Sequence, residues 1–219
     1  MSDTFTAEQR AKLEDYLANH ILPSGLGSEE SACSIAAINL AINGELKDNI
    51  PPCMSKVLGK ATIRLQDNMP DKMRNSDRYK ALLPDMAGTG RDNESERLAV
   101  LMDWVWSTAL PQLQPLADEI GFGVEWSNMC RLKTREAARC AAEAADADAN
   151  AADADAAYAA AAAANAAAYA AAAAAAYNAA AAAAAYNAAS AAGFNTFWND
   201  VDPISVLERM TYLNGDKDE

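Results

Sequence analysis

The chain has 219 residues, of which 31 are acidic and 18 are basic, so its formal net charge is −13. This length allows one ordinary domain with an extension, or two small domains. An acidic chain repels nucleic-acid phosphates, so direct DNA or RNA binding is not expected. The opening residues lack the apolar core of a signal peptide, and no run of about 20 strongly apolar residues occurs. We therefore expect a soluble, cytoplasmic protein without membrane contact.

The first 136 residues carry apolar side chains at helical spacing throughout. Thr6 and Gln9 form a capping box at the start of the first helix, and Asn43-Gly44 supplies a stop for the second. Ser28 is taken as the start of that second helix, and no alternating pattern of useful strand length is found. The first four helices are expected at 7–22, 28–42, 53–69 and 71–83, and Pro84 ends the fourth. A fifth helix is expected to begin at 94 and to kink or divide at Pro111 and Pro115. A sixth is expected to begin at 124 and to continue without a break beyond residue 136.

Residues 137–193 form an alanine-rich tract. Alanine has the best helix propensity, and no proline or glycine interrupts the tract before Gly193. A long rod and a helical hairpin both fit, because the asparagines of the tract are weak helix formers that can mark turns. The tract is either a packing or spacer element or a surface that recognises a partner. The candidate partner-contact residues are Asp146, Asp148, Asp153, Asp155, Tyr158, Tyr169, Tyr177 and Tyr186.

The last segment, 194–219, differs in character from the tract. Phe194, Phe197 and Trp198 are too apolar to lie together in water, so they are expected to dock on another surface. Asp202-Pro203 predicts the start of a short amphipathic helix. The expected architecture is all-α, with an N-terminal multi-helix domain at 1–136, a long alanine-rich helix or helical hairpin at 137–193, and a C-terminal segment with a short helix at 194–219.

The sequence contains little that predicts catalytic chemistry. The single histidine, His20, lies at a helix end without a recognisable partner, which argues against histidine-dependent triads and two-histidine metal sites. Four cysteines without a CxxC motif are interpreted as reduced, mostly buried thiols. No enzymatic activity, metal or cofactor is therefore expected. The four cysteines are Cys33, Cys53, Cys130 and Cys140.

Two blocks of the sequence resemble a group of bacterial and prophage-encoded proteins. They are CSIAAINLAINGELKDNIPPCMSKVLGKATIRLQDNMPDKMRNSDRYKALLP at 33–84 and AGTGRDNESERLAVLMDWVWSTALPQLQPLADEIGF at 87–122. In that group an alanine-rich tract with Tyr, Asp and Asn follows, and the chain closes on an FW…DP…LLE-like ending, here FWNDVDPISVLERM at 197–210. The resemblance implies a phage or mobile-element setting, and it implies no particular activity or functional residues.

The charge is uneven along the chain, because 1–136 holds 20 acidic and 15 basic residues, whereas 137–219 holds 11 acidic and 3 basic residues. Such acidity either keeps a protein soluble or imitates a polyanion toward a protein that normally binds nucleic acid. Together with the phage setting, it predicts a non-catalytic protein-binding protein. Its partner would be a nucleic-acid-binding defence complex of the host, of CRISPR or restriction type, inhibited in the host cytoplasm. The alternative is a self-associating structural protein whose alanine tracts pack between copies.

Overall fold

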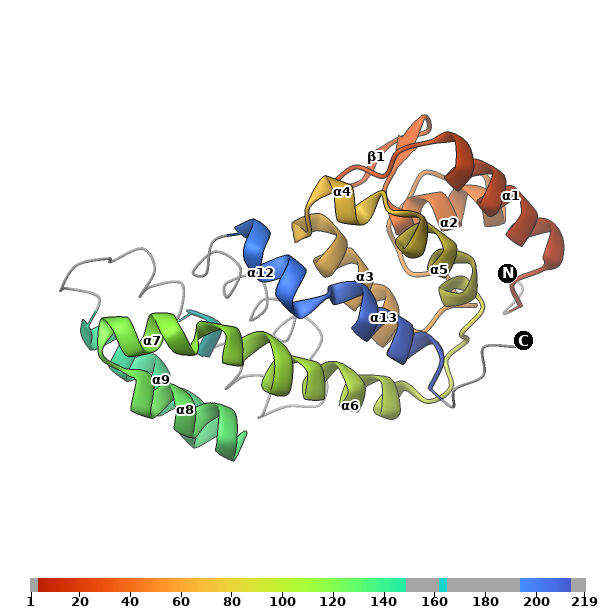
Figure 1. Cartoon of the computed structure of the whole chain (residues 1–219). Helices are drawn as coiled ribbons and strands as arrows, with labels where there is room; N and C mark the ends of the chain where they lie inside the picture. The colour runs from red at the N-terminus through yellow and green to blue at the C-terminus, as the bar shows by residue number, and fades with distance from the viewer. Residues whose placement is uncertain (1–3, 149–161, 165–193, 214–219) are drawn as a thin grey trace. The chain divides into compact units, whose positions relative to one another are not determined.

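The computed structural model describes residues 4–148, 162–164 and 194–213 (Figure 1). Within these residues the chain is predominantly helical, which confirms the predicted all-α class. The described part contains one small sheet, formed by β1 (Gly27–Ser28) and β2 (Ser31–Ala32), which pair antiparallel with Gly27 opposite Ala32.

The chain forms two compact units, the first from 1–98 with 203–219 and the second from 99–202. The helix α6 (Glu94–Trp104) contains the boundary between them. The helices of the first unit are α1 (Ala7–Asn19), α2 (Ser34–Asn43), α3 (Lys56–Asn68), α4 (Asp71–Arg74), α5 (Asp77–Ala87) and α13 (Pro203–Thr211). The second unit contains a π-helical turn η1 (Val105–Ala109), a 3-10 turn η2 (Leu110–Leu113), α7 (Gln114–Ile120), α8 (Gly123–Leu132), α9 (Arg135–Asp148) and α12 (Phe194–Val201).

The predicted ends of α1 and α2 are confirmed at two positions. The Thr6 side chain accepts from the Gln9 amide, and the Gln9 side chain accepts from the Thr6 amide, so the capping box forms. Gly44 ends α2 in the left-handed conformation with φ of 72°, which a residue without a Cβ adopts readily.

The predicted start of α2 at Ser28 is wrong, because residues 27–32 form the β1–β2 hairpin and the helix begins only at Ser34. The Tyr16 hydroxyl of α1 explains the difference. It donates to the Glu29 carbonyl at 3.0 Å and accepts from the Ala32 amide at 2.8 Å. These two bonds tie the backbone of the hairpin to α1, and a local sequence pattern does not reveal them.

The segment 71–83 is not one helix ending before Pro84. A short helix, α4, stops at Arg74, and Ser76 begins α5 by accepting from the Tyr79 amide at 3.3 Å. Helix α5 then continues through Pro84 to Ala87. An interior proline costs a helix about 3 kcal/mol, but Pro84 and the apolar residues beside it are buried, and their burial offsets that cost.

Helix α13 completes the core of the first unit by packing against α3 and α5 (Figure 1). Its side chains Val206, Leu207 and Met210 are fully buried. The Arg97 guanidinium donates to the Met210 carbonyl at 2.9 Å, and Arg78 pairs with Glu208 at 2.6 Å. The last residues described therefore stabilise helices that lie more than a hundred positions earlier in the chain.

A kink or division is predicted at Pro111 and Pro115. The α-helical part of α6 ends earlier, at Trp104, and the chain passes through η1 before Pro111 lies in the 3-10 turn η2 and Pro115 lies in the first turn of α7. Buried indoles hold this part of the second unit together. Trp104 donates to the Val201 carbonyl of α12 at 2.9 Å, and Trp126 of α8 donates to the Leu110 carbonyl at 3.0 Å. Both bonds satisfy an N–H group that would otherwise be buried without a partner.

The prediction that the helix from 124 runs unbroken into the alanine tract is wrong. Lys133 ends α8 in the left-handed conformation with φ of 54°, and α9 begins at Arg135 beside α8 (Figure 1). The Thr134 hydroxyl accepts from the Ala137 amide at 3.3 Å, which satisfies one of the free amides of the new helix. Most of the alanine tract lies outside the described residues, so the choice between a rod and a hairpin stays a prediction.

Two of the three aromatic residues expected to dock, Phe197 and Trp198, are buried, and the surroundings of the Phe194 side chain lie outside the description. In α12, Phe197 is 1% exposed and Trp198 is 0% exposed, and their rings meet edge to face with centroids 5.4 Å apart. Helix α13 begins at Pro203, which confirms the predicted start at Asp202-Pro203.

Candidate protein-binding surfaces

Helix α9 is the described beginning of the alanine-rich region, and its two faces differ sharply. Five of its alanines are buried, and the helix packs against α7 and α8. Alanine permits this close approach because its side chain is a single methyl group. The side chains of Arg135, Glu136, Arg139 and Glu143 are exposed. The buried alanines are Ala137, Ala138, Ala141, Ala142 and Ala145.

The exposed face of α9 is partly neutralised by its own residues. Arg139 contacts Glu136 at 2.6 Å and Glu143 at 2.5 Å, so one cation lies between two carboxylates. The hydrogen bond from Arg139 lowers the pKa of Glu136. Such exposed pairs contribute little to stability. With the exposed Arg135 included, the charges of α9 that precede the aspartates of the tract sum to zero.

Two of the predicted contact residues, Asp146 and Asp148, lie in the last turn of α9. The structure describes this backbone but not the surroundings of these two side chains. Whether the predicted residues form one surface therefore stays a prediction. The predicted contact residues outside the described part are Asp153, Asp155, Tyr158, Tyr169, Tyr177 and Tyr186.

A shallow groove of about 420 Å³ follows the α8–α9 pair. Glu125, Arg131 and Glu136 contribute charges to its lining, and Cys140 contributes an exposed thiol. Leu132, which is 48% exposed, adds an apolar side chain to the same groove. The groove therefore mixes charged and apolar contacts, as protein-binding surfaces do at their rims.

The first unit contains a polar pocket of about 300 Å³, where the start of α1 meets the C-terminal end of α2 and the loop that follows. Its polar side chains are largely bonded to neighbours. Gln9 donates to the Ile42 carbonyl at 3.3 Å. Lys47 contacts the Glu45 carboxylate at 2.9 Å. The lining residues are Thr4, Gln9, Asn39, Ile42, Asn43, Glu45, Lys47, Asn49, Pro51, Pro52 and Cys53.

Asn39 is the buried polar residue of this pocket, with 4% of its surface exposed. Its amide nitrogen donates to the carbonyls of Ile35 at 3.1 Å, Lys47 at 2.8 Å and Asn49 at 2.9 Å. These bonds shape the loop after α2 around the side chain. The sequence analysis missed Asn39, although an asparagine among the apolar residues of IAAINLAI was a visible signal.

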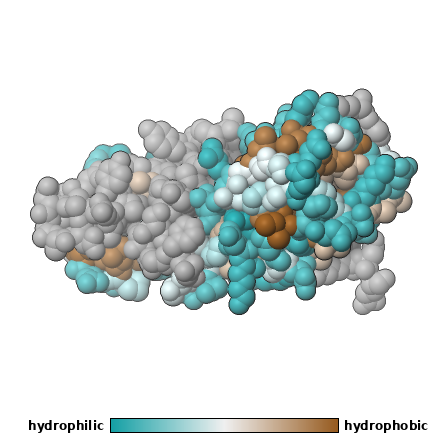
Figure 2. All heavy atoms as spheres, turned by 90° about the horizontal axis from the view of Figure 1, so that it is seen from above, coloured by the Kyte–Doolittle hydropathy of each residue, from teal (hydrophilic) through white to brown (hydrophobic). Residues whose placement is uncertain are grey.

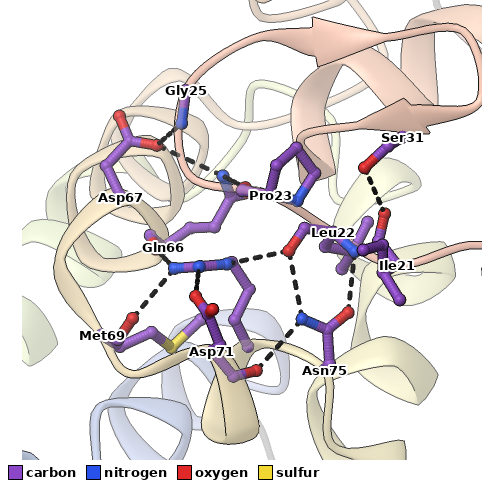
Figure 3. Close-up of polar contacts among 11 residues, drawn as sticks. Ile21, Leu22, Pro23, Gly25, Ser31, Gln66, Asp67, Met69, Asp71 and Asn75 are labelled. Atoms are coloured by element: carbon purple, nitrogen blue, oxygen red, sulfur yellow. Dashed lines mark hydrogen bonds and ion pairs between the residues drawn. The ribbon is translucent and has the colours of Figure 1, made fainter.

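A second buried polar cluster, around Arg74, is closed rather than open (Figure 3). Arg74 is 3% exposed and donates to the carbonyls of Leu22 at 2.9 Å, Gln66 at 2.7 Å and Met69 at 2.9 Å, and it also pairs with Asp71. Asn75 adds bonds to the amide and carbonyl of Leu22. Every nitrogen of the guanidinium has a partner within the chain. The cluster therefore connects the loop before β1 to the end of α3.

Exposed large apolar side chains are sparse on the described surface of the first unit, where Ile21 is 66% and Leu26 is 41% exposed. In the view of Figure 2, hydrophilic residues predominate on the coloured surface at the right, and smaller hydrophobic areas lie among them. Scattered apolar residues of this kind are normal on a soluble surface. The polar pocket is therefore a more specific feature of this unit than any apolar patch.

The contacts of His20 and the burial of the cysteines can be compared with the structural roles predicted for them. His20 stacks on Tyr16 with ring centroids 4.2 Å apart, and its Nδ1 lies 2.9 Å from the Tyr16 carbonyl. Cys33 is buried, and burial raises the pKa of its thiol. Burial likewise raises the pKa of Cys130 to about 11. The expectation of buried thiols is confirmed for Cys33 and Cys53, whereas Cys130 is half-buried and Cys140 is exposed, because α9 turns its alanines inward.

No protein-family model, curated protein or solved structure matches this chain. In the described part, no group of three or more His, Cys, Asp or Glu side chains is placed to hold a metal ion. Among the described helices, none combines the length and hydropathy needed to cross a membrane.

Proposed function

We propose that the chain is a non-catalytic protein-binding protein of phage or prophage origin. Its acidic C-terminal part inhibits a nucleic-acid-binding defence complex of the host, of CRISPR or restriction type, in the host cytoplasm. The observation that carries the proposal is the charge of 137–219, where 11 acidic residues stand against 3 basic ones. A surface of this kind competes with nucleic acid for a basic groove.

The geometry of α9 supports this proposal. Its alanine face packs within the chain, so the charged face is the one available to a partner. Glu136 and Glu143 lie on that face, where Arg139 pairs with both, and the aspartates of the tract follow them in the sequence. The His20 ring stacks on the Tyr16 ring, which supports the non-catalytic part of the proposal.

The test is affinity capture from a nuclease-treated bacterial host lysate, read by mass spectrometry at low and high salt. The screening length falls from about 10 Å at 0.1 M salt to about 3 Å at 1 M, so a charge-driven complex is expected to dissociate at high salt. Added double-stranded DNA is expected to displace the same complex. Capture that survives both 1 M salt and the DNA competitor would show that polyanion mimicry is wrong.

A matched pair of variants locates the surface. The test variant replaces four aspartates of the tract with asparagine, and the control neutralises four exposed carboxylates of the first unit. Both change the net charge by four, but only the test variant is expected to lose the complex. Equal loss in both would indicate a non-specific charge effect. The test positions are Asp146, Asp148, Asp153 and Asp155, and the control positions are Glu8, Glu14, Asp15 and Glu29.

Self-association remains the second candidate, because an alanine helix gains little from burial alone and is stabilised by close packing with another helix. In the described part, the alanines of α9 already pack against α7 and α8. Light scattering over a hundredfold range of protein concentration distinguishes the two candidates. A mass equal to one chain at every concentration would exclude the self-associating protein.

A further inference from the structure

We infer that helix α8 is the contact surface of a homodimer, in which it packs antiparallel on α8 of a second copy of this chain. The two-fold axis that relates the copies passes beside Asn128, near the middle of the helix. All residues of this surface lie in the second unit and precede the aspartates of the tract. The inference therefore goes beyond the proposed function, since it requires neither the acidic tract nor a host protein.

Two large apolar side chains of α8 are open to solvent. Val124 is 72% exposed and Leu132 is 48% exposed, whereas Trp126 and Met129 of the same helix are fully buried. At 100° per residue, positions 124, 128 and 132 fall within about 80° of the helix surface, so both apolar side chains share a face with Asn128. Apolar residues at this spacing are typical of a helix that packs on a second helix.

The charges of this face are arranged symmetrically about Asn128. Glu125 lies three residues before it and Arg131 three residues after it, which is about 4.5 Å along the axis on each side. Arg131 donates to Asn128 at 2.9 Å, and within the described residues neither Glu125 nor Arg131 forms an ion pair. In a two-fold contact each residue meets the same position pair from both directions. An antiparallel copy therefore places Glu125 opposite Arg131 of the second copy, twice per dimer.

The register that pairs the charges also pairs the apolar side chains. Val124 lies four residues before Asn128 and Leu132 four residues after it, so the same axis places Val124 against Leu132 of the second copy. Glu125 in the first turn and Arg131 in the last turn also suit the dipole of α8 itself. The dipole does not require exposed apolar residues at matching positions. The agreement of both kinds of pair in one register points to a second copy.

The groove between α8 and α9, which lie side by side (Figure 1), provides room for the second helix. The side chains that line its volume of about 420 Å³ include Glu125, Asn128, Arg131 and Leu132 of α8 and Cys140 of α9. Helix α8 has 10 residues, so it is about 15 Å long. A helix pair of that length buries less than the roughly 800 Å² per partner that is standard for a stable complex. The dimer is therefore expected to be weak and to dissociate on dilution.

The experiment is light scattering of the full chain under reducing conditions, over a hundredfold range of concentration. The wild-type mass is expected to rise from one chain to two. Glu125→Arg and Arg131→Glu each replace two opposite-charge pairs with two like-charge pairs, so each is expected to weaken the dimer about tenfold. An equal mixture of the two variants is expected to dimerise again, because one copy supplies only arginines and the other only glutamates at these positions.

Recovery in the mixture separates a contact between copies from damage to the helix, since mixing does not repair a misfolded chain. Leu132→Ser is expected to weaken the dimer about fivefold or more, because it removes the larger apolar side chain of each pair. Ile21→Ser is the matched control, since Ile21 is 66% exposed in the first unit, and it is expected to change nothing. A mass of one chain at every concentration, or a mixture no better than either variant alone, would overturn the inference.

The position of the axis is tested by cross-linking in a Cys140→Ser background. Asn128→Cys places a thiol where the helix meets its own copy, and a disulfide requires Cβ atoms about 3.5–4.5 Å apart. Ser127→Cys is the control, because that exposed position is turned 100° away from Asn128 on the same helix. With copper–phenanthroline as oxidant, a covalent dimer is expected from the 128 variant alone. Equal cross-linking of the two variants, or none from the 128 variant, would show that the register is wrong.

The capture experiment and these measurements fail separately. A dimer that Glu125→Arg weakens, from a chain that captures no host complex, would support the α8 contact and contradict the inhibitor function. Capture of a host complex by a chain that stays monomeric would do the reverse. Self-association that Glu125→Arg and Arg131→Glu leave unchanged would favour packing between alanine tracts and overturn the α8 contact.

Discussion

Replacement of Arg74 with methionine is expected to destabilise the first unit by about 3–5 kcal/mol. Methionine keeps an unbranched apolar stem but supplies no donor, so the carbonyls of Leu22, Gln66 and Met69 lose their partner. A hydrogen bond to a charged group contributes about 1.5–3 kcal/mol. Three such bonds are lost, and relief from burying the cation offsets part of the sum, so the net loss is expected to be about 3–5 kcal/mol.

The assay is urea denaturation followed by far-ultraviolet circular dichroism, with hydrogen exchange of α3 as a local readout. Asp71→Asn is the control, because the Asp71 side chain is 89% exposed and its pairing with Arg74 is worth at most about 1 kcal/mol. Arg74→Lys is expected to fall between the two, since an ammonium cannot reach carbonyls on several sides at once. A methionine variant within 1 kcal/mol of the wild-type chain would refute this reasoning, as would an asparagine control that costs as much.

Three further outcomes are expected. Leu207→Ala leaves a cavity in a fully buried site and is expected to cost about 2–5 kcal/mol in urea denaturation; a loss below about 1 kcal/mol would contradict the docking of α13. Burial and the hydrogen bond to Asp85 raise the pKa of Tyr212 to about 12. The stabilisation that the neutral phenol provides is therefore complete below pH 10 and is lost as the pH rises toward 12. The difference in absorbance at 295 nm between wild type and Tyr212→Phe checks this, and a transition near pH 10 would disagree. At pH 8, a thiol reagent is expected to label the exposed Cys140 first, while the half-buried Cys130, with its pKa of about 11, reacts slowly as a neutral thiol. Equal rates of labelling at the two thiols would contradict the raised pKa of Cys130.

The polar residues that shape the two clusters show the limits of sequence reading. Arg74 lies in DKMRNSD and looks like an ordinary surface residue, because nothing nearby shows that three carbonyls from distant segments converge on it. Asn39 carried a weak signal, since polar residues are rarely placed among apolar residues of one helix without a partner. The pocket beside it was not predictable, because its lining comes from α1, α2 and the loop that follows.

The sequence by itself determined the features that depend on neighbouring residues. The all-α class, the capping box at Thr6 and the stop at Gly44 all follow from propensity or local hydrogen bonds. Tertiary structure decided what depends on contacts between distant segments. The hairpin before α2 depends on the hydroxyl of Tyr16, and the extension of α5 through a proline depends on burial. The packing of α13 on α3 and α5 likewise depends on the burial of apolar side chains. A local pattern cannot show which segments bury these side chains together, because the free energy of burial does not depend on distance along the chain.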